Sequence, residues 1–300
     1  MSLSGFVDFL IGIMEEGLLY AIIAMGVYIT YKILDFPDLS VDGTFPLGAA
    51  VTAVFIIAGV NPVLTLLLSF LVGAIAGAIT GLIHVKLKVR DLLSGIIMMT
   101  ALYSINLRIA GSANVAIFSK ETIFENAFLD GLLPEAMKDY IDLIILLIIV
   151  IIMKVLLDIY LKTKSGYLLR AVGDNDTLVT SLAKDKGIVK IIGLAIANAF
   201  VALAGSIYAQ KSGFFEISIG TGTIVVGLAS VIIGTNIFKR MTFVKGTTAV
   251  ICGSVIYKAC VAVAIRCGMN ASDLKLITAI LFLGILVISS ERKRRVKNHD

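Results

Sequence analysis

Apolar residues occur in long stretches along this 300-residue chain, and the stretches are apolar on every side rather than alternating. The run 143–153 (LIILLIIVIIM) and its apolar flanks reach the roughly 20 residues with which a helix crosses about 30 Å of hydrocarbon. Strands of a transmembrane barrel would be about 10 residues long and alternating. The pattern therefore predicts an all-α membrane protein, a polytopic helical bundle.

We expect about nine transmembrane spans, within a range of eight to ten, in a single domain covering 1–300. They cover 17–34, 45–60, 63–85, 92–112, 141–161, 188–209, 219–237, 244–265 and 273–290. An odd number of crossings puts the two termini on opposite sides of the membrane.

Composition and charge support this interpretation and give it a direction. The chain is 58% hydrophobic and 16% charged, with a mean hydropathy of +1.00, which excludes a water-soluble fold. The net charge of +5 comes from basic clusters between the spans, at 86–90, 162–190, 239–245 and 292–297, and not from a nucleic-acid-binding surface. Basic loops are cytoplasmic, so we expect the N-terminus outside and a basic cytoplasmic tail at 291–300.

One connection departs from this charge rule. The segment 35–44 (DFPDLSVDGT) falls on the cytoplasmic side by counting, yet it carries Asp35, Asp38 and Asp42 and no base. It is either an unwound break within the membrane, which makes the second span discontinuous, or a short cytoplasmic turn whose acids cap helix starts. In the first interpretation, Thr44 caps a new helix whose first turn holds Pro46.

Small residues predict close helix packing. Gly73, Gly77 and Gly81 form a GxxxGxxxG ladder on one face of the third span. A compact bundle follows from this ladder, but no particular activity does.

Polar residues inside the spans are candidates for a transport path, because an ionisable group in hydrocarbon is costly unless it is paired or wetted. Lys258 lies mid-span and is placed to face the bundle interior or to pair with Glu216 or Asp273. Asn106 approaches the outer end of the fourth span. Lys154 and Asp158 are one helical turn apart, which predicts a structural ion pair.

Catalytic chemistry has little support. His84 and His299 are the only histidines, so neither a His-based triad nor a metal cluster can be assembled. No GxxxxGK[ST] phosphate loop occurs. We therefore expect no enzyme activity, no cofactor and no metal bound by this chain.

The stretch 162–190 mixes charge with short apolar spacing. Asp174 or Asp176 can cap a short helix whose apolar face includes Leu178 and Leu182, and Gly187 can end it. Such a helix is either a docking element for a cytosolic partner or an ordinary amphipathic helix at the membrane surface.

A family resemblance favours the docking interpretation. The runs 165–175 (SGYLLRAVGDN) and 202–210 (ALAGSIYAQ), with further likeness over 20–36, 92–106 and 223–234, resemble the permeases of branched-chain amino acid ABC importers and their sugar-importing relatives. In that family a G-x-x-x-R-A-x-x-x-(D/N) stretch precedes the coupling helix on which the ATPase docks. The resemblance thus implies a coupling segment at 162–187 that includes Gly166, Arg170, Ala171, Gly173, Asp174, Asp176, Leu178 and Leu182.

The resemblance also implies partners and a path. It implies cytoplasmic ABC ATPases that use ATP and an external solute-binding protein. It also implies a second copy of the permease in a homodimer, or a close relative in its place, embedded in the lipid bilayer of the bacterial plasma (inner) membrane. Where amino acid importers commonly have Asn-Phe-Ala-His-Gly, this chain has the acidic 35–43 run, which resembles a branch suggested to carry aromatic amino acids. The expected path residues are Asp35, Asp38, Asp42, Thr44, Asn106 and Lys258. The alternative is an ion-coupled secondary transporter or channel that needs no ATPase.

Overall fold

The protein is all-α, as its sequence pattern predicts. The computed structural model describes residues 3–126, 140–174, 185–239, 241, 243–266, 276, 278–280, 282–284 and 287. Its elements are α1 (Leu3–Val27), the π-helical turn η1 (Tyr28–Ile33), α2 (Val41–Ile57), α3 (Pro62–Lys86), α4 (Asp91–Ala110), β1 (Asn114–Ala116), α6 (Ile141–Tyr160), α7 (Lys164–Asp174), α9 (Lys186–Ser212), β2 (Phe214–Glu216), the 3-10 turn η3 (Ile217–Gly220), α10 (Thr223–Ile237) and α11 (Gly246–Arg266).

Seven helices of the described residues are long and apolar enough to cross a membrane, and α2 is a shorter apolar helix. The first helix begins at Leu3 rather than near 17. Its acids do not end it, because Glu15 and Glu16 pair with Lys211 of α9 and Lys258 of α11. The expected last span, 273–290, falls largely outside the described residues, and the basic tail 291–300 does so entirely.

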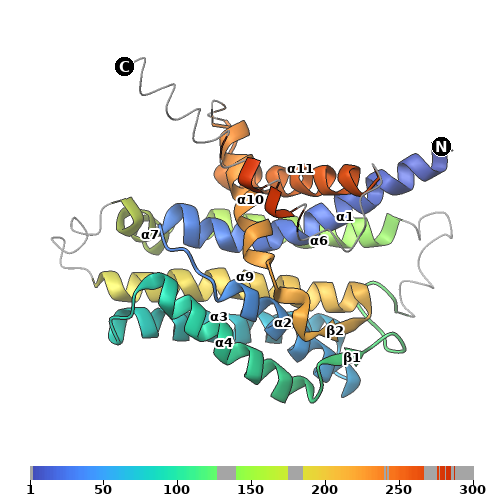
Figure 1. The fold of residues 1–300 in the computed structure, drawn as a ribbon, viewed down its shortest axis with the longest axis horizontal. Helices are drawn as coiled ribbons and strands as arrows, with labels where there is room; N and C mark the ends of the chain where they lie inside the picture. Colours follow the sequence, from blue (N-terminus) through green and yellow to red (C-terminus); the bar gives the residue numbers. More distant parts are fainter. Residues whose placement is uncertain are drawn as a thin grey trace.

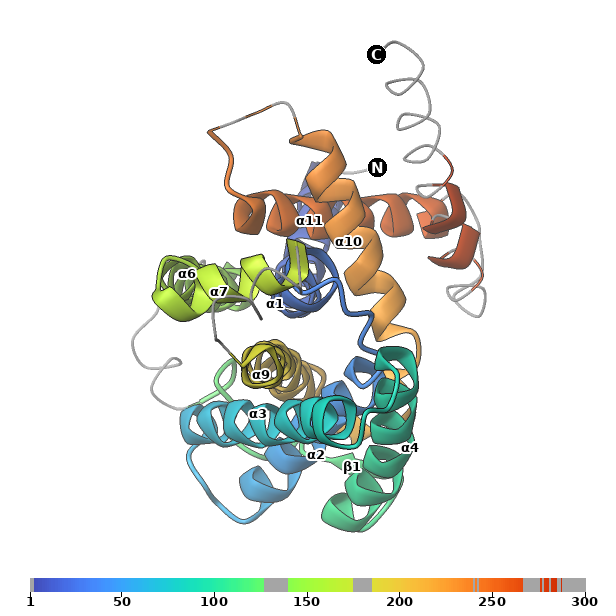
Figure 2. The ribbon, with the colours of Figure 1, turned by 90° about the vertical axis from the view of Figure 1, so that its left-hand side faces the viewer.

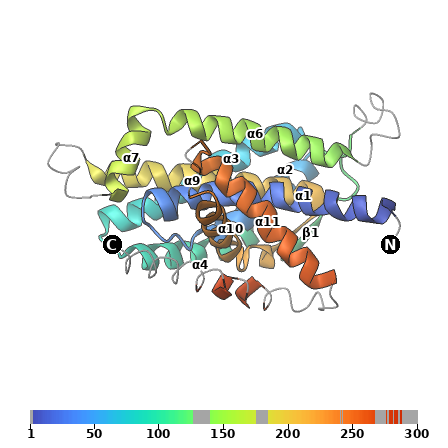
Figure 3. The same cartoon turned by 90° about the horizontal axis from the view of Figure 1, so that it is seen from above.

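Helix α9 lies at the centre of the bundle (Figures 1 and 2). Helices α1, α6 and α7 lie on one side of it, and α2, α3 and α4 lie on the other. Helices α10 and α11 pack against each other and against α1, and they cross the other helices at a steep angle (Figure 3). The long helices of the described residues therefore contact α9 itself or a helix that packs on α9.

The glycine ladder of α3 lies against α9. A β-carbon on Gly77 would strike the carbonyl oxygen of Leu194, and one on Gly73 would lie 2.6 Å from the carbonyl oxygen of Asn198. Gly81 approaches Ile191 in the same way. The two backbones touch directly, which is the close approach that small residues allow.

The two ends of the bundle differ in charge. Helix α7, the start of α9 and the junction between α3 and α4 gather at one end, and β1, β2 and the N-terminus lie at the other (Figure 1). The clusters at 86–90 and 162–170 belong to the first end.

Gly187 lies in the first turn of α9, where Asp185 accepts a hydrogen bond from its N–H at 2.8 Å, so the prediction that Gly187 ends a short helix is wrong.

A glycine substitution tests the α3–α9 contact. Gly77→Ala forces the two backbones apart, and such overpacking lowers the free energy of unfolding by about 1–3 kcal/mol. Gly12→Ala is the matched control, because no atom lies within 4 Å of its β-carbon position and alanine favours helix. Thermal unfolding in detergent should show a lower midpoint for Gly77→Ala alone, and equal midpoints would contradict the contact.

Candidate functional site

The acidic connection after the first span is an unwound segment. Residues 34–40, called the break below, are not helical, and α2 resumes the helix at Val41. The break is therefore shorter than the expected 35–44. Thr44 does not cap α2, because Ser40 holds the cap position and the Thr44 hydroxyl donates to the Ser40 carbonyl at 3.0 Å. Pro46 is the sixth residue of α2 and not part of its first turn.

A hydrogen-bonded group fixes the break to the central helix. Asp38 is 1% exposed, and its carboxylate accepts from Nδ2 of Asn198 at 2.7 Å and from the N–H of Ser40 at 2.9 Å. The Ser40 hydroxyl donates to Oδ1 of Asn198 at 3.2 Å. Asp35, by contrast, is exposed, with a left-handed φ of 52°. Within the break, Asp38 thus serves to hold the segment on α9.

Asp42 joins α2 to α10. Its two carboxylate oxygens accept from the N–H groups of Gly222 at 3.0 Å and Ile224 at 2.8 Å. These are the first amides of α10, whose own cap residue is the left-handed Gly222 with a φ of 88° and has no side chain. Asp42 therefore caps a helix that lies 180 residues later in the chain.

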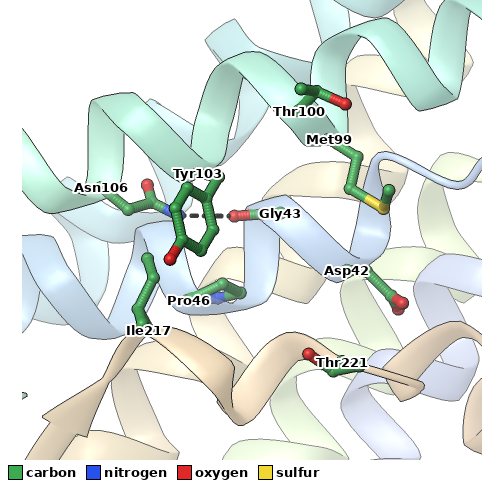
Figure 4. A pocket seen from close by; sticks show the side chains of 9 residues that line it. All are labelled: Asp42, Gly43, Pro46, Met99, Thr100, Tyr103, Asn106, Ile217 and Thr221. Atoms are coloured by element: carbon green, nitrogen blue, oxygen red, sulfur yellow. Dashed lines mark hydrogen bonds between the residues drawn. The ribbon is translucent and has the colours of Figure 1, made fainter. Parts of the chain in front are cut away.

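A cavity of about 350 Å³ opens beside Asp42, and we call it the acceptor cavity. Gly43 and Pro46 of α2 line it together with Met99, Thr100, Tyr103 and Asn106 of α4, Ile217 of η3 and Thr221 (Figure 4). Asp42 and Thr221 lie at one end of the view and Asn106 at the other, next to the Tyr103 ring. The described lining contains no lysine or arginine.

Asn106 contributes an unpaired acceptor to this wall. The side chain is 0% exposed, and its Nδ2 donates to the Gly43 carbonyl at 3.0 Å, which fixes the orientation of the amide. Its Oδ1 is buried and has no hydrogen-bond partner in the described part of the chain. A buried polar atom without a partner costs about 1–3 kcal/mol, so this oxygen, buried beside the cavity, is a candidate for ligand contact once a neighbouring side chain moves.

Lys258 lies near a second cavity of about 290 Å³, which also includes Thr221. Its Nζ is 3.0 Å from the Glu16 carboxylate and 3.5 Å from the centre of the Tyr20 ring. Of the acids expected as alternatives for Lys258, Glu216 is not its partner, because the ammonium pairs with Glu16. Asp273 lies outside the described residues. The predicted pair of Lys154 and Asp158 is confirmed at 3.1 Å.

The segment 162–187, for which the family resemblance implies a coupling role, includes α7. Gly166 packs on Tyr160 and Leu161, and Gly173 packs on the Ile33 carbonyl, directly before the break. Arg170 is exposed and Ala171 is half-buried. Asp174 is the last residue of α7, so it does not begin a helix. Asp176, Leu178 and Leu182 lie outside the described residues.

Sequence reasoning missed several residues of this site. Asn198 is an amide in the middle of an apolar span. Because a polar group in a span is costly to bury, this position could have been identified from the sequence. Tyr103 has no such signal, because a tyrosine in a span is common. Glu16 and Tyr20 could not be assigned to Lys258, because their contact joins residues 242 positions apart.

Comparisons with known proteins agree with this architecture. The sequence pattern of the family described as "Branched-chain amino acid transport system / permease component" matches residues 9–289. The chain belongs to this permease family. The permease is 46% identical to a "Tyrosine transport system permease protein" of Clostridioides difficile (strain R20291), over 92% of this chain and 90% of that protein. It is 32% identical to an uncharacterised protein of Rickettsia prowazekii (strain Madrid E), over 95% and 99%. No solved structure matches.

A double-mutant cycle tests the bond between the break and α9 in the permease. Asn198→Ala leaves the Asp38 carboxylate without its closest donor and should lower the free energy of unfolding by about 1–3 kcal/mol. Adding Asp38→Ala should then cost less than it does alone, with a coupling energy of about 1 kcal/mol or more. Denaturant melts of the four proteins provide the measurement. Additive effects would contradict the bond.

Proposed function

We propose that this permease forms the translocation path of an ATP-driven importer for aromatic amino acids, with tyrosine as the first candidate. The 46% identity to the tyrosine transport system permease protein, over nearly the full length of both chains, is the observation that carries the proposal. The acceptor cavity supplies independent chemical support.

The cavity suits a solute that brings an ammonium group. Asp42 is an acid without an ion pair to any lysine or arginine of the described residues, and Asn106 adds an unpaired carbonyl oxygen. Both groups accept hydrogen bonds, and neither can bind a carboxylate. Tyr103, Met99 and Ile217 offer apolar and aromatic surface to a side chain. The amino group of the solute is thus the charged end that this cavity recognises.

A second copy of the permease would complete the path. The acceptor cavity opens at the face of α4 where Thr100, Tyr103 and Ser104 are exposed. Polar groups and a carboxylate in an open cavity cannot face lipid without a large cost, so this face requires water or protein against it. A homodimer with the α4 faces opposed meets that requirement, and an external binding protein would deliver the solute to it.

The basic end of the bundle would be cytoplasmic, with the N-terminus outside. The ATPase subunits would dock on the segment 162–187 at this end. Helix α7 contacts Ile33, directly before the break, and Leu34, the first residue of the break, and the break leads through Asp38 to Asp42 at the cavity. A displacement of α7 would therefore act on the cavity through one short piece of chain.

Transport measurements test the cavity assignment. Asp42→Asn removes the charge, and Asn106→Leu removes the unpaired oxygen; each should lower the initial rate of tyrosine uptake roughly tenfold or more, the equivalent of about 1.4 kcal/mol. Uptake is measured in proteoliposomes that contain the permease, its ATPase and its binding protein. Asp8→Asn, an exposed acid outside the cavity, is the control. Normal uptake by both cavity variants would contradict the site, and uptake without ATP would contradict the importer.

A second experiment tests coupling through α7. Gly173→Ala places a β-carbon against the Ile33 carbonyl and should shift α7 away from the break. We expect ATP hydrolysis within about twofold of wild type but uptake reduced roughly tenfold, since the ATPase still docks while its motion no longer reaches the cavity. Gly12→Ala again serves as the control. Equal loss of hydrolysis and uptake would indicate that assembly, and not coupling, depends on this contact.

A further inference from the structure

A third cavity, different from the acceptor cavity and from the one beside Lys258, lies at the basic end of the bundle. We call it the basic cavity. Its volume is about 320 Å³, and it lies between the end of α6, α7 and the start of α11. Lys162, Arg170 and Lys245 contribute cations to its wall, and Tyr28 and Tyr167 contribute phenol rings. It shares no lining residue with the acceptor cavity, and although Lys162, Tyr167 and Arg170 belong to the segment 162–187 of the transport proposal, that proposal assigns the cavity itself no ligand.

The basic cavity carries more positive charge than its own acid can offset. Asp158 is its single described acid and is already saturated, because it accepts from Lys154 at 3.1 Å, Lys245 at 2.9 Å and Thr247 at 2.6 Å. Within the described part of the chain, the Lys162 and Arg170 side chains make no hydrogen bond or ion pair. Two cations therefore face the cavity without a counter-charge, which is the chemistry of an anion site.

The position of the cavity identifies the source of the anion. Helix α6 lies at the periphery of the bundle (Figure 2), and it exposes Ile152, Leu156 and Ile159, each more than half exposed. This apolar face is lipid-facing, and it ends within one turn of Lys162. A hydrocarbon chain lying on that face would place its headgroup at the mouth of the basic cavity. Tyr167, 60% exposed, has the amphipathic character of residues at a membrane interface.

We propose that the basic cavity binds the headgroup of an anionic phospholipid. The phosphate oxygens accept hydrogen bonds from Lys162, Arg170 and Lys245, and the acyl chains lie along the exposed face of α6. Basic pockets between transmembrane helices at the cytoplasmic surface are suited to anionic headgroups. The lipid then bridges α6, α7 and α11.

Lipid binding to the full chain tests the proposal. The purified chain in neutral detergent is titrated with dioleoyl phosphatidylglycerol, with dioleoyl phosphatidylcholine, or with inorganic phosphate, and bound lipid is counted by native mass spectrometry. We expect one phosphatidylglycerol to be retained at concentrations where phosphatidylcholine is lost. Lys162→Gln should weaken binding about fivefold, and Lys162→Gln with Arg170→Gln roughly 25-fold, because each cation near the lipid charge contributes about that factor.

The control and the contrary outcomes are defined by the same assay. Lys86→Gln removes an exposed cation at the same end of the bundle but outside the cavity, and it should leave binding unchanged. Lys162 makes no described side-chain bond, so Lys162→Gln tests the site without disturbing the fold. Equal retention of the two lipids, or equal loss on Lys86→Gln and Lys162→Gln, would overturn the proposal. Displacement of both lipids alike by inorganic phosphate would assign the cavity to a free anion instead.

Discussion

A backbone segment that leaves the helix in the interior of a bundle must find partners for its buried polar groups within its own protein, and the break between η1 and α2 shows how this permease meets that constraint. Asp38 accepts from Ser40 within the break and from Asn198 across it. Gly95 of α4 has no side chain, so the backbone at Leu39 can approach α4 closely on the other side. The break is thus enclosed between two helices, and its geometry depends on both.

The other parts of the structure are arranged around this enclosed segment. At its start, Leu34 contacts Gly193 of α9, and α7 packs on the same turn. After it, Asp42 holds the first amides of α10 and forms one wall of the acceptor cavity. The cytoplasmic docking region of the proposal and the cavity are therefore neighbours along the chain, although they lie at different depths in the bundle.

The sequence predicted what local patterns determine. The apolar stretches located the spans of α3, α4, α6, α9 and α11 to within a few residues, because their length and hydropathy need no tertiary information. The acids without a base identified the break, and the spacing of Lys154 and Asp158 gave their ion pair. The coupling role of 162–187 came from family resemblance alone, because spacing could not distinguish it from a surface helix, and it stays a prediction.

The long-range partners could not be predicted in this way. Thr44 was expected to cap α2 because threonine is a good cap residue, but the tertiary position of Ser40 decided the helix start. Asp42 finds α10, Asp38 finds Asn198 and Lys258 finds Glu16 across separations of more than 150 residues. No periodicity encodes such pairs. The sequence therefore pointed to Asp38, Asp42 and Lys258 as notable residues but could not give the partner of each.

The cap that Asp42 provides has a consequence for biogenesis. The ribosome delivers Asp42 to the membrane long before the amides of Gly222 and Ile224, which follow 180 residues later. Until then the carboxylate has no α10 to hold, just as the glycines of α3 have no α9 to meet. The first four helices thus enter the bilayer as an incomplete half whose polar groups await the second.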